Sequence, residues 1–221
     1  MLDETTPKGR LISASLKLAA ERPWKSVSLI EIADASGLTL ADVRAHVDGK
    51  PAIVRGFVRA VDDALLKLAR KPQAGAGRRD ALFEVIMARF DLLGPHKAAI
   101  RSIMKDADPD LRLFASALAS QQWMLAAAGI DASGAGGSVR TIGLASVYVS
   151  VFRTWLDDDD AGQARTMAAL DRRLRRGERN LQAVEGVCDT VSALGKRVGE
   201  LFSGARRGRE GVRPSGSDTP T

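Results

Sequence analysis

Apolar residues recur every three to four positions along most of the chain, the spacing of a helix with one buried face. No stretch alternates strictly between apolar and polar residues within bounding turn residues, as a half-buried strand would. The first clear stripe, Leu11, Ala14 and Leu18, predicts a helix over residues 8–21 that Pro23 brings to an end. The pattern therefore predicts an all-α fold.

Two short helices are predicted next, each by a capping pattern. In residues 28–31, Ser-Leu-Ile-Glu, the serine hydroxyl can accept from the backbone amide three positions on while the glutamate reaches back. A helix over 29–36 follows, ended by Gly37, which can adopt the left-handed conformation of a tight turn. Residues 39–42, Thr-Leu-Ala-Asp, repeat the pattern with aspartate and open a helix to about His46. Two short helices joined by such a turn form a helix-turn-helix unit.

The remaining pattern predicts a larger helical body. Pro51 suits the first position of a long helix to about residue 70, because its missing amide would be unpaired there. Further helices are predicted over residues 79–93, 95–105, 109–128, 138–156 and 162–183, with linkers or loops at 72–77, 131–137 and 157–160. We therefore expect a helix-turn-helix domain over 1–50, a ligand-binding and dimerisation bundle over 51–183, and an amphipathic helix with a basic, disordered tail over 184–221.

Composition narrows the class of protein. Of the 221 residues, 45% are hydrophobic and 27% charged, as in ordinary globular proteins. No run approaches the length of about 18 apolar residues that crosses a bilayer, and the first ten residues lack an apolar signal core. We therefore expect a cytoplasmic protein. The net charge of +6 does not lie in the predicted helix-turn-helix, because residues 1–50 contain seven bases and seven acids.

Candidate chemistry is sparse. No nucleophile beside a base, no paired acids in a catalytic setting and no glycine-rich phosphate loop are recognisable, so we expect neither an enzyme nor a cofactor. One cysteine and two histidines match no zinc spacing. The aspartates at 157–160 can either bind a divalent cation or form a turn that caps the next helix, and the second is the simpler hypothesis. The arginines within 172–179 either attract an anion or complement the end of a helix.

Over residues 10–65 the chain resembles the TetR family of transcriptional regulators. The resemblance rests on a first helix that ends before Trp24, on the segment that begins at Ser28, on Gly37-Leu38-Thr39, and on Val43, His46 and Lys50 at the family's spacing. It implies that Thr39 caps the recognition helix and contacts a phosphate, that Lys50 contacts another phosphate, and that His46 orients the end of this helix. Such contacts position a protein on DNA without reading its sequence.

The same resemblance implies a site for double-stranded DNA. Its members are Ser28, Thr39, Leu40, Ala41, Asp42, Arg44, His46 and Lys50. Arg44 is the one side chain among the exposed recognition positions that is well suited to hydrogen-bond base edges, and it stands where the family usually has tyrosine. Asp42 would bring a negative charge toward a polyanion. DNA binding is therefore expected to depend on Arg44.

The resemblance also implies a homodimer that binds a hydrophobic small molecule. Phe90, Trp123, Tyr148 and Phe152 can line a ligand pocket, or they can belong to the core or to a dimer contact. The predicted dimer contact comprises Ala145, Trp155, Leu156 and Leu170. Together these expectations describe a ligand-responsive repressor.

A weaker resemblance concerns the C-terminal half. Thr166, Met167 and residues 170–174 are similar to the closing helix of TetR-fold proteins that bind isoprenoid lipids in ubiquinone biosynthesis. An apolar stripe over 184–203 would allow a terminal helix to lie on a membrane surface. The alternative expectation is therefore a lipid-binding accessory protein that no longer binds DNA.

Overall fold

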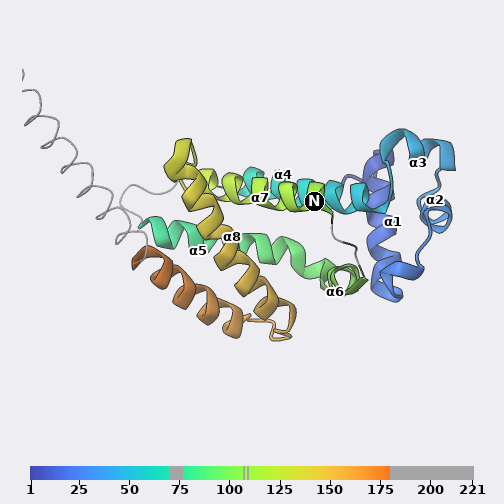
Figure 1. The fold of residues 1–221 in the computed structure, drawn as a ribbon. Helices are drawn as coiled ribbons and strands as arrows, with labels where there is room; N and C mark the ends of the chain where they lie inside the picture. Colours follow the sequence, from blue (N-terminus) through green and yellow to red (C-terminus); the bar gives the residue numbers. More distant parts are fainter. Residues whose placement is uncertain (70–76, 107, 109, 180–221) are drawn as a thin grey trace, which may run out of the picture. The chain divides into compact units, whose positions relative to one another are not determined.

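The N-terminal part of the chain folds into eight named helices, numbered α1 to α8 in the computed structural model (Figure 1). The structure describes residues 1–69, 77–106, 108 and 110–179. Within these residues there are helices and no strands, which confirms the predicted all-α class. The predicted amphipathic helix over 184–203 and the basic tail lie outside the described residues, as does nearly all of the predicted linker at 72–77.

The helices α1 to α8 have the following bounds: Pro7–Glu21, Leu29–Ser36, Leu40–His46, Lys50–Leu68, Arg78–Leu93, Lys97–Asp106, Leu111–Ala127 and Gly134–Leu156. Two short 3-10 helices, η1 and η2, span Trp24–Ser26 and Gly94–His96. Residues 164–179 are also helical. The helices α2 and α3 match the predicted ranges, whereas Pro95 lies in the 3-10 helix η2 and the α-helix α6 begins only at Lys97.

One predicted loop is wrong. Residues 131–137 were expected to be a flexible loop, but α8 begins at Gly134. Gly137 lies so close to the backbone of the preceding loop that a Cβ built on it would be 2.1 Å from the carbonyl carbon of Ala132. Gly137 therefore permits a close approach of two backbone segments, and it does not interrupt the helix.

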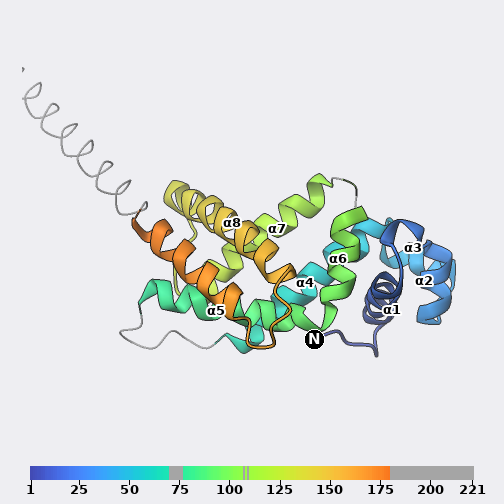
Figure 2. The same ribbon diagram turned by 90° about the horizontal axis from the view of Figure 1, so that it is seen from below.

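Residues 1–175 form one compact unit. Within this unit, α1 packs against α2 and α6, while α4 packs against α1, α5 and α7 (Figures 1 and 2). The long helix α4 buries Ile53, Phe57, Val61 and Leu65, four residues spaced by one helical turn. This single buried stripe connects the helix-turn-helix with the helices of the body.

Candidate nucleic-acid interface

The first helix of the helix-turn-helix, α2, is held at its N-terminus by the predicted capping box. Ser28 Oγ accepts from the amide of Glu31 at 3.2 Å, and the amide of Ser28 donates to Glu31 Oε2 at 2.8 Å. These hydrogen bonds from Ser28, together with an ion pair to Arg22, lower the pKa of Glu31 to about 2. The Glu31 carboxylate therefore remains charged at neutral pH and fixes the start of α2.

The turn between α2 and α3 requires its glycine. Gly37 has φ +65° and ψ +35°, a left-handed conformation that a side chain disfavours. Its amide donates to the carbonyl of Asp34 at 3.1 Å, and the amide of Leu38 donates to the carbonyl of Ala33 at 3.0 Å. These bonds close the C-terminus of α2 and set the direction in which α3 begins.

The recognition helix α3 is capped by Thr39 and Asp42, as predicted. Thr39 Oγ1 accepts from the amide of Asp42 at 3.1 Å, and it donates its hydroxyl proton to Asp42 Oδ2 at 2.6 Å. The amide of Thr39 donates to the same carboxylate oxygen at 2.9 Å. Both hydrogen bonds from Thr39 lower the pKa of Asp42, and the bond from the Thr39 side chain has the larger effect. Asp42 is thus bound to the start of its own helix.

The side chains of α3 divide cleanly between core and solvent. Val43 is buried in the core and anchors the helix. The other six positions of the helix are exposed: Leu40, Ala41, Asp42, Arg44, Ala45 and His46. Within the part of the chain that the structure describes, the guanidinium of Arg44 has no hydrogen bond or ion pair. The structure therefore leaves the predicted base-reading residue available to a ligand outside the chain.

Lys50, which is predicted to contact a phosphate, also forms hydrogen bonds within the chain. Its Nζ donates to the carbonyl of Val27 at 2.8 Å and also to that of Trp24, and it lies 4.4 Å from the centre of the Trp24 ring. Burial lowers the pKa of Lys50. An ammonium group carries three hydrogens, and two of them are used in these bonds. Lys50 ties the connection before α2 to the first turn of α4, and one hydrogen remains for a further acceptor.

Sequence reasoning missed Arg10 of α1. A Cβ built on Gly37 would lie 3.8 Å from Nη1 of Arg10, which places this guanidinium beside the turn between α2 and α3. Its positive charge contributes to the lowered pKa of Asp42. Only the packing of α1 beside α2 and α3 reveals this position, because Arg10 precedes the turn by more than twenty residues and no spacing rule connects them.

The helix-turn-helix is fastened to the body through α6. The amide of Trp24 donates to Ser102 Oγ at 2.9 Å, and this hydroxyl donates to the carbonyl of Arg22 at 3.1 Å. The amide of Lys25 donates to Asp106 at 3.3 Å. One turn of backbone after α1 is therefore held by two side chains of α6.

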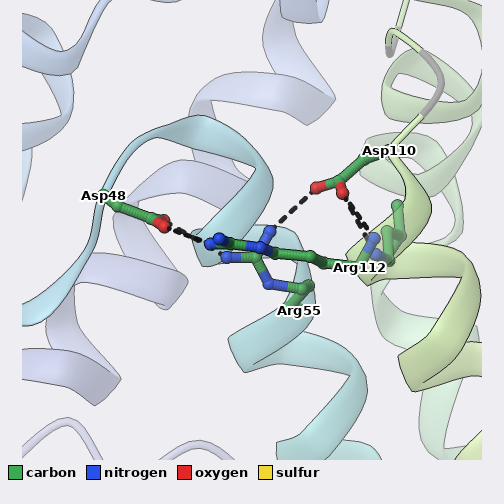
Figure 3. A network of polar contacts seen from close by, with 5 residues as sticks. Asp48, Arg55, Asp110 and Arg112 are labelled. Carbon is green, nitrogen blue, oxygen red and sulfur yellow. Dashed lines mark hydrogen bonds and ion pairs between the residues drawn. The ribbon is translucent and has the colours of Figure 1, made fainter.

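A second connection runs through charged side chains (Figure 3). Arg55 of α4 reaches Asp110 at 2.8 Å and Asp48 at 3.2 Å. Arg112 contacts Asp48 at 3.0 Å, and Asp110 also caps α7 by accepting from the amide of Arg112 at 2.7 Å. The loop after the recognition helix is thus joined to the N-terminus of α7 by a network of two arginines and two aspartates.

The predicted pocket residues do not come together at one place. Phe90, Tyr148 and Phe152 form an aromatic cluster with Trp155, in which ring centres are 5.3–6.4 Å apart. Trp123 is separate from this cluster, is 53% exposed and lines a cleft between α4 and α7. Phe90 is fully buried within the core, so its side chain packs against other rings.

A charged network crosses the body next to the aromatic cluster. Arg89 of α5 pairs with Asp62 of α4 and donates from Nε to the hydroxyl of Tyr148 in α8 at 3.1 Å. Ser120 of α7 donates to the other oxygen of Asp62 at 2.7 Å. Burial raises the pKa of Tyr148, which keeps its hydroxyl neutral. Four helices therefore contribute to one buried and hydrogen-bonded group of side chains.

The predicted dimer contact needs correction. Trp155 and Leu170 are 1% and 0% exposed, because both lie in the core of the single chain, so neither can form a surface contact. Ala145 and Leu156 are partly buried. The exposed large apolar residues of α8 are instead Val139, Ile142 and Val149, which share one face of the helix at spacings of three and seven.

The acidic turn after α8 has a structural role. Asp158 is buried, and its Oδ2 accepts from the amide and hydroxyl of Thr166 at 2.9 and 2.7 Å, while Asp160 accepts from the amide of Ala164 at 3.2 Å. The hypothesis that these aspartates cap the next helix is confirmed. Among the described residues, no group of three or more His, Cys, Asp or Glu could hold a metal ion. The helices in these ranges also include none that could span a membrane.

Several solved structures are similar to this fold. A TetR transcriptional regulator from Nitrosomonas europaea ATCC 19718 has a TM-score of 0.63 and 19% identity, with 77% of this chain and 97% of that chain covered. A TetR transcriptional regulator from Rhodococcus sp. RHA1 has a TM-score of 0.57 and 17% identity, with coverages of 79% and 97%. For a TetR-family transcriptional regulator from Streptomyces coelicolor the values are 0.55 and 20%, with 90% and 99% covered.

No family model matches the sequence, and no curated protein is similar to it. At these identities the likeness lies in the arrangement of the helices, which agrees with the resemblance expected from residues 10–65. The chain therefore has the fold of the TetR family, with an N-terminal helix-turn-helix on a helical body.

Proposed function

We propose that this protein is a DNA-binding transcriptional regulator that acts as a homodimer in the cytoplasm and responds to a small molecule. The observation that carries the proposal is the exposed face of α3, on which Arg44 has no polar partner among the described residues. An arginine can form two hydrogen bonds to the O6 and N7 atoms of guanine in the major groove. Arg44 is therefore the proposed base-reading residue.

The environment of Asp42 supports this proposal. An unpartnered carboxylate on a recognition helix would repel DNA phosphates, but the carboxylate of Asp42 accepts two bonds from Thr39 and lies near Arg10 and His46. We propose that the Asp42 carboxylate is held by the N-terminus of α3, which it caps, and therefore repels DNA phosphates less. Leu40 and Ala41 would offer apolar contacts to thymine methyl groups. The balanced charge of residues 1–50 then predicts weak binding to unrelated DNA.

Phosphate contacts would complete the interface. We propose Ser28, Thr39, His46 and Lys50 for this role, and we add Arg10, since its guanidinium lies beside the turn. Lys50 would contribute its third hydrogen while it holds the carbonyls of Trp24 and Val27. Its substitution would therefore disturb the helix-turn-helix itself, which makes Arg44 the cleaner position for a test.

A homodimer would present two recognition helices to successive turns of a duplex. The exposed stripe of Val139, Ile142 and Val149 on α8 is the surface that we propose for pairing with a second copy. The alternative function, isoprenoid-lipid binding, depends on a membrane-contacting helix over 184–203 that lies outside the described residues. The similar structures carry the names of transcriptional regulators, so regulation is the better supported function.

The test is a gel-shift titration at about 50 mM salt with duplex DNA from upstream of the protein's own gene. Replacing Arg44 with alanine should weaken binding about tenfold, the lower range for one bidentate base contact. Arg78→Ala, which removes an exposed arginine at the start of α5, is the matched control and should leave binding unchanged. Absent binding, or equal losses in the two variants, would contradict the proposal.

A further inference from the structure

A long cleft runs between α4 and α7 and ends beside the recognition helix. Its volume is about 750 Å³, within the usual range for small-molecule sites. One wall is a face of α4 from Ala52 to Leu66, a length of about 21 Å at the rise of an α-helix. Ser116, Ala119 and Trp123 of α7 form the opposite wall, and residues 44–48 close one end.

Three cations of this cleft are uncompensated among the residues that the structure describes. Lys8, Arg44 and Arg59 line it, and none of them has a polar partner in the described ranges. Two of the acids that line the cleft are instead neutralised by ion pairs: Asp48 is paired with Arg55 and Arg112, and Asp62 is paired with Arg89. Asp63 is the one lining acid without a partner in these ranges. The cleft therefore favours an anion.

The far end of the cleft has a different chemistry. Arg55 pairs with Asp110 and Asp62 pairs with Ser120, so residue numbers rise in the same direction along α4 and α7. Continuing in this direction places Leu66 beside Trp123, at the end of the cleft remote from α3. Trp123 is 53% exposed, although indole rings are usually among the more buried side chains. A half-exposed indole beside Leu66 and Ala119 offers a surface against which a flat aromatic group can pack.

We propose that this cleft binds a small aromatic molecule that carries a negative charge, such as an aryl carboxylate. The ring would lie against Trp123 and Leu66, and the carboxylate would point along α4 toward Arg59, whose guanidinium can donate two parallel hydrogen bonds to it. This site is separate from the aromatic cluster of Phe90, whose rings pack against one another.

The position of the cleft gives such a ligand a route to regulation, and this step rests on the proposed DNA binding. The end of the cleft that faces α3 is formed by Arg44, His46 and Asp48. Arg44 is the proposed base-reading residue, and Asp48 belongs to the network that joins this loop to α7. An anion bound near Arg59 would compete electrostatically for Arg44 and would favour one arrangement of this network over another.

Binding can be measured without DNA by fluorine NMR on the full chain labelled with 5-fluorotryptophan. The chain has three tryptophans, and Trp24 and Trp155 are 4% and 1% exposed. Titration with 2-naphthoate should shift the resonance of Trp123, identified by its loss in Trp123→Phe, and leave the other two in place. The neutral analogue 2-naphthamide has nearly the same shape and should bind much more weakly.

Two matched arginine variants test whether Arg59 is the residue that binds the carboxylate of the ligand. Arg59→Gln should weaken binding of 2-naphthoate about tenfold, as expected for the loss of one charge-assisted contact. Arg173→Gln, at an exposed arginine of the helix over 164–179, should have no effect. An unshifted Trp123 resonance at millimolar naphthoate, equal affinity for the amide, or an unchanged affinity in Arg59→Gln would each overturn the proposal. Because no DNA is present, these results are independent of the gel-shift outcome.

Discussion

Gly37 shows how one residue can set the geometry of the whole recognition unit. Its backbone has φ +65°, and a Cβ added there would meet only Nη1 of Arg10, at 3.8 Å. The cost of a side chain at this position is therefore conformational rather than steric. The turn, the two capping boxes and the buried Val43 together orient the exposed face of α3.

Replacing Gly37 with alanine should destabilise the fold by about 1 kcal/mol, the cost of a left-handed conformation for a residue with a Cβ. Gly143→Ala is the matched control, because Gly143 lies inside α8 with no atom within 4 Å of an added Cβ. That change should stabilise the protein by about 0.5 kcal/mol or more. Urea unfolding of both variants measures the difference, and a Gly37→Ala protein as stable as the control would contradict this account.

At the scale of helices, apolar spacing and capping residues predicted most of the elements, since both are local properties. The ranges of α2 and α3 follow directly from Ser28, Gly37 and Thr39. The start of α8 was missed, because the glycines there appeared to mark a loop, whereas Gly137 lies within the helix and permits close contact with the backbone of Ala132. Local pattern cannot show what a glycine packs against.

The pair formed by Asp62 and Arg89 joins α4 and α5, and no spacing rule predicted it. Removing one partner leaves an uncompensated buried charge, so Asp62→Ala and Arg89→Met should each cost about 3–5 kcal/mol. Ser120→Ala removes a single hydrogen bond to Asp62 and should cost about 1 kcal/mol.

Chemical denaturation would rank these three variants, and the double variant Asp62→Leu with Arg89→Met should recover much of the loss. If either single charge variant were no less stable than Ser120→Ala, the pair would not have the structural role that its burial indicates.

At the scale of the whole molecule, the compact unit contains both the helix-turn-helix and the body up to Arg175. Contacts from Ser102, Asp106, Asp110 and Arg112 fasten the head to α6 and α7. A change in the body can therefore reach α3 through a few identifiable bonds.

The proposed homodimer predicts that Ile142→Glu is monomeric, because a buried charge in the apolar stripe of α8 would lack a partner. Ile142 is 62% exposed in the single chain, so this change should leave the fold intact. Met104→Glu is the matched control, since Met104 of α6 is 60% exposed outside the stripe. Analytical ultracentrifugation should find a dimer for the wild type and for Met104→Glu, and a dimeric Ile142→Glu would exclude this surface.

The sequence by itself determined the helical class, the two capped helices and the turn at Gly37, because caps and turns act between residues within four positions of one another. It also identified Arg44 as a candidate reader. Tertiary structure decided which side chains are buried in the core and which can contact a ligand or a partner. It placed Trp155 and Leu170 in the core, left Trp123 open to a cleft, and brought Arg10 and Lys50 to the helix-turn-helix. Burial and long-range contact depend on how helices pack, and that information is not contained in any local stretch of the chain.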